Sequence, residues 1–491
     1  MAAKAIKNKS TVLLLLILVF ALVLRIIFFT GISSSDSLYY SEFANKISRH
    51  EPFITGGNGQ HLALRLGIVF PVALLYSIFG ANEFTSNIIP LLFSLFSVIL
   101  IYKFGKFLFD ERTGLLSALL LSFFPLDIIF GTSLLGDVPA AFFMALSVYL
   151  FLKAEKNGNS RSSIFSGISL GVAYLIREMS VLMALFFIFY AIYNRKIKNI
   201  YFFVPLGFLL VALIEFLYFW HATGNPFYRY SIVSGIHNEF LLTDPKYQRG
   251  NFPISLLYFP YLILRDYLSR FFSLFIFMSG FYCFTHRKKS GYILLLWFVP
   301  LLLYICFGST SLSRYILFPV DLRFLLMVSF PGLMMLAYFL SDESKIMKKL
   351  AMPCILAFLL LTSIGFVHLS GYRNFLDKEK AIHSYAQSLP PKPVYTDEST
   401  FRVLNYLDGY KNDNLKSFNY YEFLNPGKNS AMNLSNLKNS YVVIYWGRIN
   451  FNLNAGKNIK YPDEIFHIPK RWVLKKEIGA GADKTQIYFA E

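Results

Sequence analysis

The chain has 491 residues, of which 55% are hydrophobic, 18% aromatic and 15% charged. A soluble domain carries about 25% charged residues, so the composition excludes an ordinary soluble protein and indicates several membrane crossings. The net charge of +18 would suggest nucleic-acid binding in a soluble protein. Here the lysines and arginines cluster between apolar runs, as the positive-inside rule predicts, and we expect no nucleic-acid partner.

Apolar runs follow one another through the first three quarters of the chain, and a helix needs about 20 such residues to cross a bilayer. The first run, 11–30, is long and lacks a small-residue cleavage pattern, so we interpret it as an anchor rather than a signal peptide. The further runs lie at about 64–80, 85–104, 115–131, 138–153, 163–178, 180–194, 199–219, 268–285, 291–307, 323–340 and 350–369.

The run 64–80 decides the topology, because it is short and contains Arg65 and Pro71. We predict that it lies along the interface or re-enters instead of spanning. About eleven spans then remain, and with a cytoplasmic N-terminus every inside loop carries three Lys or Arg residues, whereas the short outside turns are poor in charge. The sequence therefore predicts a multi-pass cell-membrane protein whose C-terminal region is extracytoplasmic.

Three segments on the predicted outer side are large: 31–84, 220–267 and 371–491. The last is rich in Asn, begins near Pro390, Pro391 and Pro393, and contains the β-like runs VYTD (394–397) and YVVIYW (441–446). We predict a transmembrane domain over 1–370, which includes the first outer loop 31–84, and an extracytoplasmic domain over 371–491. The expected fold class is an all-α polytopic membrane protein with a small α/β C-terminal domain.

Ionisable side chains near a membrane are costly and are usually functional or close to an interface. On the predicted outer side they gather together with two tyrosines, at Arg25, Asp36, Tyr39, Tyr40, His61, Arg65, Asp137, Arg177, Glu178, His221, Arg314 and Arg323. Each has a plainer interpretation. Asp36 and Asp137 can cap helices, the arginines can reach toward the interface, and the tyrosines can belong to an aromatic belt. Similarly, the histidines can be interfacial, and Glu178 can simply pair with an arginine. Their convergence on one side indicates a site at the membrane surface.

The chemistry of that site is narrowed by motifs that the sequence lacks. It contains no Walker A sequence, no G-x-S-x-G and no H-E-x-x-H, so an ATP-driven pump, a serine hydrolase and a zinc protease lack local support. Arginine binds phosphate through its planar fork. Four arginines could surround a lipid-linked phosphate and stabilise it as a leaving group. They are Arg65, Arg177, Arg314 and Arg323. Asp36 would take the proton of an acceptor hydroxyl.

Several of these residues lie in motifs whose order resembles a known family. The motifs are SDSLYYSEFA with Asp36, Tyr39 and Tyr40, HLALRLGIVFPVALLYSIFG, KFLFDERTGLLSALLLSFFP, LLGDVPAAFF with Asp137, GISLGVAYLIRE with Arg177, and RYILFPVDLRFLLMVSFPGLMML with Arg314 and Arg323. Together with Arg25 near the end of the first span, they resemble the GT-C membrane glycosyltransferases. The branch is that of the protein O-mannosyltransferases and aminoarabinose transferases, and the resemblance covers roughly residues 11–340.

The resemblance implies an inverting transferase that uses a polyprenyl- or dolichyl-phosphate sugar on the extracytoplasmic face. It implies that Asp36 is the catalytic carboxylate, with Asp137 also in the cavity, and that Arg65 touches the donor phosphate. We assign six further residues to the substrate cavity: Arg25, Tyr39, Tyr40, His61, Glu178 and His221. Protein O-mannosyltransferases usually carry an Asp-Glu pair in the first loop, but here Ser37 follows Asp36. The acceptor, whether lipid, glycan or protein, therefore stays open.

No cofactor is expected, because the sequence shows no convincing set of metal ligands; some GT-C relatives bind a divalent metal, so that question stays open. A flippase or transporter of lipid-linked sugars is the alternative function, but such proteins typically contain inverted repeats, and no internal repeat is visible. A structural scaffold would not require the clustered arginines and aspartates. The sequence thus favours a membrane glycosyltransferase.

Overall fold

The computed structural model of the chain divides into two compact units. The structure describes residues 2–54, 59–195, 197–234, 253–310, 315–341, 350–421, 429–454 and 459–491. Unit 1 comprises Met1–Thr30, Arg65–Ile68 and Asn87–Arg373. Unit 2 comprises Gly31–Leu64, Val69–Ser86 and Asn374–Glu491. Most of the first outer loop thus belongs to the same unit as the C-terminal region, whereas the expected division assigned that loop to the transmembrane domain.

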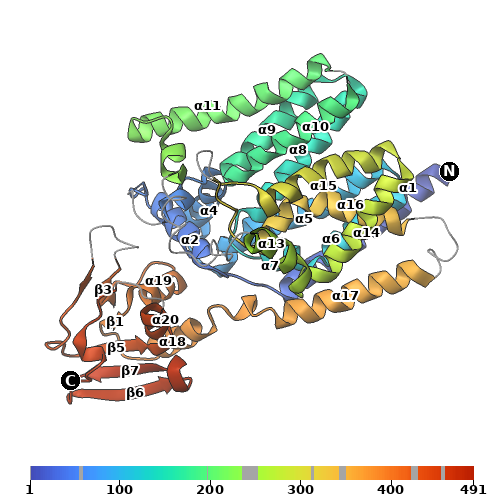
Figure 1. Cartoon of the computed structure of the whole chain (residues 1–491). Helices are drawn as coiled ribbons and strands as arrows, with labels where there is room; N and C mark the ends of the chain where they lie inside the picture. The colour runs from blue at the N-terminus through green and yellow to red at the C-terminus, as the bar shows by residue number, and fades with distance from the viewer. Residues whose placement is uncertain are drawn as a thin grey trace. The chain divides into compact units, whose positions relative to one another are not determined.

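Unit 1 is formed by apolar helices (Figure 1). In chain order they are α1 (Ala2–Ile27), α5 (Glu83–Leu108, which begins in unit 2), α6 (Glu111–Ser122), α7 (Pro125–Phe130), α8 (Asp137–Asn157), α9 (Ser160–Ile176), α10 (Ala184–Asn194), α11 (Phe203–Thr223), α13 (Ile254–Arg265), α14 (Arg270–His286), α15 (Lys289–Phe307), α16 (Ser329–Leu340) and α17 (Met352–Leu369). Short 3-10 helices accompany them, among them η1 (Glu178–Met183), η2 (Asn199–Phe202), η3 (Leu322–Val328) and η5 (Tyr372–Asn374, which ends in unit 2).

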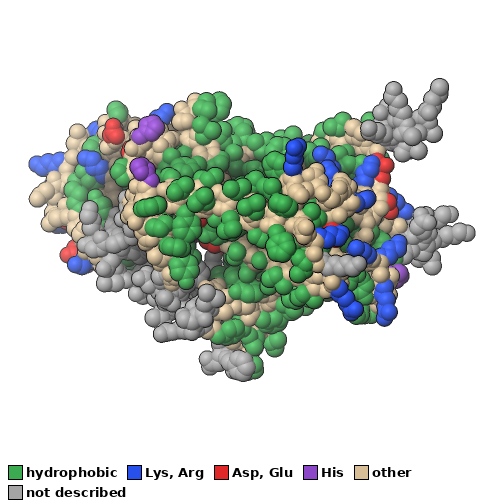
Figure 2. Space-filling model, turned by 90° about the horizontal axis from the view of Figure 1, so that it is seen from above, with side chains coloured by type: hydrophobic (Ala, Val, Ile, Leu, Met, Phe, Trp, Pro, Cys, Tyr) green, Lys and Arg blue, Asp and Glu red, His purple; other side chains and the backbone are tan. Residues whose placement is uncertain are grey.

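Large hydrophobic side chains lie on the surface of these helices, among them Leu16 of α1, Ile214 of α11 and Leu361 of α17. Figure 2 shows hydrophobic side chains spread over a broad surface, with Lys and Arg side chains gathered on the right, at the end of unit 1 where α1 begins. Contiguous apolar surface of this extent is unfavourable in water and suits contact with lipid. The protein is therefore a multi-pass membrane protein.

Seven helices within the described residues are long and apolar enough to cross a membrane. They are Lys9–Ile27, Glu83–Leu108, Asp137–Asn157, Asn199–Thr223, Lys289–Phe307, Leu322–Leu340 and Met352–Asn374. The pair Ile254–Arg265 and Arg270–His286, bent by 104°, raises the number to eight if it counts as one span. The polytopic helical class is confirmed, but the expected number of about eleven spans is not.

The difference arises because several apolar runs form short or interrupted helices. The run 115–131 divides into α6 and α7, since Phe124 takes an extended conformation (ψ 120°) before Pro125, as residues preceding proline usually do. The run 64–80 forms α4 (Leu66–Phe79), which is too short to count among the seven. Hydropathy alone measures the length of an apolar run and not whether one helix continues through it.

Helices α8, α9 and α11 pack closely in unit 1 (Figure 1). Two glycines allow this approach between α9 and α11: a Cβ at Gly167 would lie 2.0 Å from the carbonyl oxygen of Val204, and one at Gly207 would lie 2.1 Å from that of Ile164. Small residues commonly permit such backbone contacts between membrane helices. This packing brings the end of α9 close to the start of α8 and holds α11 alongside.

Unit 2 combines helices with a mixed sheet. Its helices are α2 (Ser35–Ser48), α3 (Gln60–Ala63), most of α4, α18 (Asp377–Gln387), α19 (Glu398–Leu407) and α20 (Trp446–Asn454). The strands are β1 (Val394–Thr396), β2 (Leu415–Ser417), β3 (Asn419–Tyr420), β4 (Ser430–Ala431), β5 (Ser440–Tyr445), β6 (Trp472–Ile478) and β7 (Thr485–Ala490). The five-stranded sheet has the order β2-β1-β5-β7-β6, in which β1 runs parallel to β2 and β5, whereas β7 is antiparallel to β5 and β6.

The sheet confirms the predicted α/β character of the C-terminal region, since VYTD supplies β1 and YVVIYW supplies most of β5. All six residues of β5 are buried. Apolar side chains on its two faces join two separate cores, one including Val442 and Ile444 and the other Val443. A strand that is covered on both faces consists of a continuous run of apolar residues. This explains why β5 could be predicted from the sequence.

Within unit 2, helix α2 of the first outer loop is attached to α19 and the turn after it. The Ser41 hydroxyl lies 2.8 Å from the hydroxyl of Tyr410, and Arg402 forms an ion pair with Glu42. Ser86 lies 3.0 Å from the Tyr406 hydroxyl. These contacts join segments more than 300 positions apart in the chain, which no local pattern in the sequence could reveal.

Candidate active site

Helix α9 ends at two adjacent charged residues, whose side chains contact different partners. Arg177 follows the last residue of α9 with an extended backbone (φ −153°, ψ 123°), and Glu178 begins η1. The Arg177 guanidinium forms an ion pair with Asp137, the first residue of α8. It also lies over the ring of Phe324, 4.9 Å from the ring centre. Asp137 is therefore the partner of Arg177 at the N-terminus of a helix, where a carboxylate is favourable.

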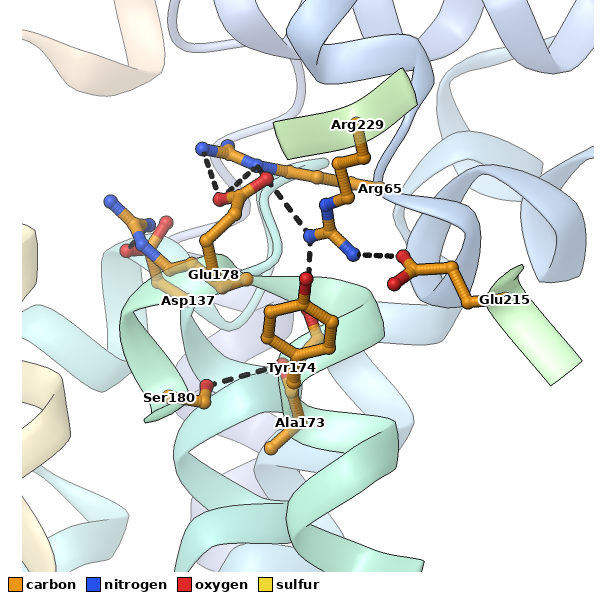
Figure 3. Close-up of polar contacts among 9 residues, drawn as sticks. Arg65, Asp137, Ala173, Tyr174, Glu178, Ser180, Glu215 and Arg229 are labelled. Carbon is orange, nitrogen blue, oxygen red and sulfur yellow. Dashed lines mark hydrogen bonds and ion pairs between the residues drawn. The ribbon is translucent and has the colours of Figure 1, made fainter. Parts of the chain in front are cut away.

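Glu178 accepts hydrogen bonds from two arginines (Figure 3). Arg65 approaches from the segment before α4, with its Nε 3.1 Å from Oε2 and its Nη2 3.0 Å from the same oxygen. Arg229, in the helical residues 228–234, donates from Nη2 to Oε1 at 2.9 Å. A carboxylate held by two guanidinium groups is fixed in orientation by charge-assisted hydrogen bonds.

Arg229 connects this pair to a third carboxylate. Its Nη1 lies 2.5 Å from Oε1 of Glu215 on α11, its Nη2 donates to the carbonyl oxygen of Tyr174 at 2.9 Å, and its guanidinium lies 4.6 Å from the Tyr174 ring centre. We name the six charged residues Arg65, Asp137, Arg177, Glu178, Glu215 and Arg229 the arginine–carboxylate cluster. The sequence analysis missed Glu215 and Arg229, although an acidic residue inside the apolar run 199–219 is a signal of a buried cationic partner.

Glycines bring the segments of the cluster close together. A Cβ at Gly67 would lie 2.6 Å from Cγ1 of Ile176, and one at Gly136 would lie 2.9 Å from Cγ2 of the same residue. The backbone after Arg65 and the backbone before Asp137 therefore both pass against the end of α9. A larger residue at either glycine would push apart the elements that carry the arginines.

The cluster contains three cations and three anions, so its formal net charge is zero. Its members differ in access. The side chains of Arg229 and Arg177 are 4% and 6% exposed, whereas Arg65 and Glu178 are 13% and 21% exposed. The Arg65–Glu178 pair is thus the part of the cluster that an anionic ligand can reach most readily. Arg177 and Arg229 hold the carboxylates around it.

The other predicted residues of unit 1 have different partners or surroundings. Arg25 is fully buried and pairs with Asp127 of α7, with Nη2 2.5 Å from Oδ1, while its Nε lies 2.5 Å from the Ser94 hydroxyl. Arg323 pairs with Asp321 at 2.9 Å, next to Phe324 in the sequence. His221 is exposed near the end of α11. Arg314 lies outside the described residues.

The other predicted residues belong to unit 2. Asp36 is half-buried in the first turn of α2, and the capping side chain of that helix is Ser34, which accepts from the Ser37 amide. Tyr40 is buried and His61 is half-buried in α3. Tyr39 packs so closely on Gly59 that a Cβ there would lie 2.6 Å from its ring. Burial raises the pKa of Tyr39 although the charge of Arg402 opposes this shift, so its phenol stays protonated.

Among the described residues, no group of three or more His, Cys, Asp or Glu side chains is arranged to hold a metal ion. The carboxylates of the arginine–carboxylate cluster face guanidinium groups. The arginines of this site can bind carboxylate and phosphate groups through paired hydrogen bonds.

Comparisons with known proteins agree with this architecture. A model of the dolichyl-phosphate-mannose-protein mannosyltransferase family matches residues 67–220, the segment that contains Asp137, Arg177 and Glu178. No curated protein sequence matches the chain significantly. ArnT from Cupriavidus metallidurans in the apo state is similar over 98% of this chain and 98% of its own, with a TM-score of 0.63 and 13% identity.

Two further solved structures share the fold. ArnT from Cupriavidus metallidurans bound to undecaprenyl phosphate has a TM-score of 0.60 and 13% identity, covering 96% of this chain and 97% of its own. The apo oligosaccharyltransferase of Archaeoglobus fulgidus has a TM-score of 0.52 and 12% identity, covering 91% of this chain and 70% of its own. The chain thus shares the fold of these membrane proteins over most of its length, and its residues 67–220 resemble the mannosyltransferase family. This likeness agrees with the resemblance that the motifs in the sequence show to the branch of the protein O-mannosyltransferases and aminoarabinose transferases.

Proposed function

We propose that this protein transfers a sugar from a polyprenyl-phosphate donor to an acceptor hydroxyl on the extracytoplasmic face of the membrane. The observation that supports this most strongly is the partly exposed Arg65–Glu178 pair within a neutral, largely buried arginine–carboxylate cluster. The match to a family named for a dolichyl-phosphate-mannose donor supports it as well, as does the ArnT structure that contains undecaprenyl phosphate. The flippase alternative gains no support from any of these relatives.

The donor phosphate would bind at Arg65. An entering phosphate offers the guanidinium the same paired oxygens that Glu178 offers, so the two anions compete for one fork. Arg229 holds the displaced Glu178 carboxylate and limits its movement. As the sugar–phosphate bond breaks, negative charge grows on the phosphate, and a guanidinium already in place stabilises it without reorganisation. Arg177, Arg314 and Arg323 are further donor-binding candidates.

Asp36 would act as the general base. It accepts the proton of the acceptor hydroxyl while that oxygen forms a bond to the anomeric carbon, and the bond from this carbon to the phosphate oxygen breaks. The phosphate leaves as polyprenyl phosphate and needs no proton, so one base suffices and the anomeric configuration inverts. Positioned proton transfer of this kind contributes about 10²–10⁴-fold in rate.

The orientation follows from charge. The inside loops predicted from the sequence carry the excess of Lys and Arg, and such loops stay cytoplasmic. The N-terminus would therefore be cytoplasmic, and unit 2 with Asp36 would be extracytoplasmic. The sugar transferred, a hexose or a pentose, would be selected by residues outside the Arg65–Glu178 pair, because that pair binds phosphate.

The test is turnover of a panel of polyprenyl-phosphate sugars by the purified protein, measured as released polyprenyl phosphate. We expect Asp36→Asn to reduce release about 100-fold or more while the protein melts as the wild type does. Asp413→Asn, at an exposed position of unit 2, serves as the matched control and should be fully active. Equal turnover by the wild type and Asp36→Asn would remove Asp36 from the mechanism, and no release from any donor would refute the function.

A further inference from the structure

Unit 2 contains a cavity of about 200 Å³ between helices α2 and α19. Helix α2 contributes Glu42, Asn45 and Lys46, and α19 contributes Phe401, Arg402 and Asn405. This volume equals roughly seven waters at liquid density. It suits a single small ring and is too small for a folded partner or an extended peptide.

The charges around the cavity largely offset one another. Arg402 forms an ion pair with Glu42, and the Lys46 ammonium lies 3.7 Å from Oε1 of the same carboxylate. Arg49, at the end of α2, donates to the carbonyl oxygen of Tyr410. Glu51 also lines the cavity, so three cations face two carboxylates and the formal net charge of the lining is only +1. The lining therefore attracts a doubly charged phosphate only weakly.

Two amide side chains face the cavity from opposite helices. Asn45 belongs to α2 and Asn405 to α19. Neither side chain makes a hydrogen bond to any described residue, although both are half-buried. A carboxamide offers two donors and a carbonyl acceptor, which is the combination that neighbouring hydroxyl groups of a sugar require.

An aromatic ring completes the lining. Phe401 is half-buried at the cavity, and the C–H face of a sugar ring packs well on an aromatic ring. Ligand sites usually combine such apolar contact with a few placed polar groups that set orientation. The lining is too polar for an acyl chain, so its chemistry favours an uncharged, polyhydroxylated ligand.

The cavity shares a helix with the proposed base. Asp36 and Glu42 are six positions apart on α2, which corresponds to about 9 Å along the helix axis. Tyr39 lies between them on the helix surface. The Arg402 guanidinium stacks over the Tyr39 ring, 4.3 Å from the ring centre. Six positions also turn the side chains about 120° apart around the axis. One rigid element thus holds both the base and the cavity, at a separation that a short oligosaccharide spans and a monosaccharide does not.

We propose that this cavity binds one sugar ring of a neutral glycan acceptor, at a ring remote from the hydroxyl that receives the new sugar. The acceptor assignment rests on the proposed transferase function. It makes the acceptor a glycan chain, rather than a peptide or a simple lipid, and it makes Asn45 and Asn405 specificity residues. The two amides bind hydroxyl groups, Phe401 supports the ring, and the helix that carries them places the far end of the chain near Asp36.

The experiment measures binding rather than turnover. Full-length protein in detergent micelles is titrated with trisaccharides of glucose, mannose and N-acetylglucosamine, and binding is followed by saturation-transfer NMR. Asn405→Phe fills the cavity, and Asn45→Ala removes one amide with little change in volume. Asn414→Phe, at an exposed position of unit 2, is the matched control, and each variant is first checked for a wild-type melting temperature.

We expect at least one trisaccharide to bind the wild type and Asn414→Phe equally. Its affinity should fall about tenfold in Asn45→Ala, which corresponds to about 1.4 kcal/mol, and binding should be lost in Asn405→Phe. The proposal is overturned if no trisaccharide binds the wild type or if both cavity variants bind as the wild type does. It is also overturned if Asn405→Phe instead abolishes binding of a short Ser/Thr peptide or of inorganic phosphate.

Binding requires no donor and no catalysis, so this result is separate from the turnover test. Loss of trisaccharide binding in Asn405→Phe, combined with unchanged turnover in Asp36→Asn, would support a glycan site and refute the proposed base. If Asp36→Asn loses turnover as expected but no trisaccharide binds the wild type, the transferase function is supported and the cavity is rejected as its acceptor site.

Discussion

Arg25 and Arg65 each pair with a carboxylate inside unit 1, but a ligand can reach only one of the two pairs. The Arg25–Asp127 pair is 0% and 5% exposed, whereas the Arg65–Glu178 pair is 13% and 21% exposed. Arg25 also bonds to the Ser94 hydroxyl and to the carbonyl oxygens of Ala21 and Ser122. Its fork is occupied by the helices it joins, while that of Arg65 pairs with Glu178, a partly exposed carboxylate that another anion can replace.

The role of an arginine in a membrane protein thus depends on what its guanidinium faces. Desolvation makes both pairs sensitive to loss of one partner. We expect substitution at Arg25 to affect the free energy of unfolding and substitution at Arg65 to affect donor recognition.

The largest effect is expected at the buried pair. Arg25→Met leaves the Asp127 carboxylate in an apolar environment without its cation and should lower the free energy of unfolding by about 3–5 kcal/mol. Chemical denaturation in detergent, followed by circular dichroism, measures this change. The double variant Arg25→Met/Asp127→Leu removes the orphaned charge and should regain a substantial part of the loss. A single variant as stable as the wild type would show that this ion pair is dispensable.

A smaller effect, of a different kind, is expected at the exposed pair. Arg65→Lys keeps the charge but loses the fork, so kcat/KM for the donor should fall about 10–100-fold, equivalent to about 1.4–2.7 kcal/mol. Its melting temperature should change little, since the pair is partly exposed. Arg161→Lys, at an exposed arginine of α9, is the matched control. If Arg65→Lys instead unfolds like Arg25→Met and retains its kcat/KM, the distinction between the two pairs is lost.

Much of the fold could be predicted from the sequence because it follows from strong local patterns. Long apolar runs predict α5, α8 and α17, and the continuous apolar run 441–446 predicts β5. The number of spans could not be predicted, because a helix break such as that between α6 and α7 depends on one residue before a proline. The first outer loop joins unit 2 through contacts between distant segments, for instance Ser41 with Tyr410, and these have no local signal.

The candidate site was only partly visible. Arg65, Asp137, Arg177 and Glu178 stood out as ionisable residues beside apolar runs, and the structure brings these four together in one cluster. Arg229 did not stand out, because it follows a helix end in a polar segment where an arginine is ordinary. Arg25 stood out, like Arg65, as an ionisable residue in an apolar run. Only the structure reveals that it pairs with Asp127 in the protein interior.

The smallest effect is expected at a half-buried carboxylate of unit 2, Asp408, which lies outside the apolar helices. Asp408, at the end of α19, lies 2.7 Å from Nε2 of His383 and accepts from Asn412 at 2.7 Å. Burial alone would raise the pKa of Asp408, but the hydrogen bonds from His383 and Asn412, together with the charge of His383, hold it below its ordinary value. The folded state therefore binds the Asp408 proton more weakly than the unfolded state does.

This sign determines the pH range in which Asp408 contributes to stability. The contribution is fully present above the unfolded pKa of about 3.9 and is lost as the pH falls through the lower folded pKa. Asp408→Asn should thus lower the free energy of unfolding by about 1 kcal/mol at pH 7, and the difference from the wild type should shrink steadily below pH 4. Thermal melts from pH 2.5 to 7 test this, with Asp413→Asn as an exposed control. A difference that stayed constant down to the lowest pH would mean that the lost contribution came from packing, and that ionisation of Asp408 has no part in it.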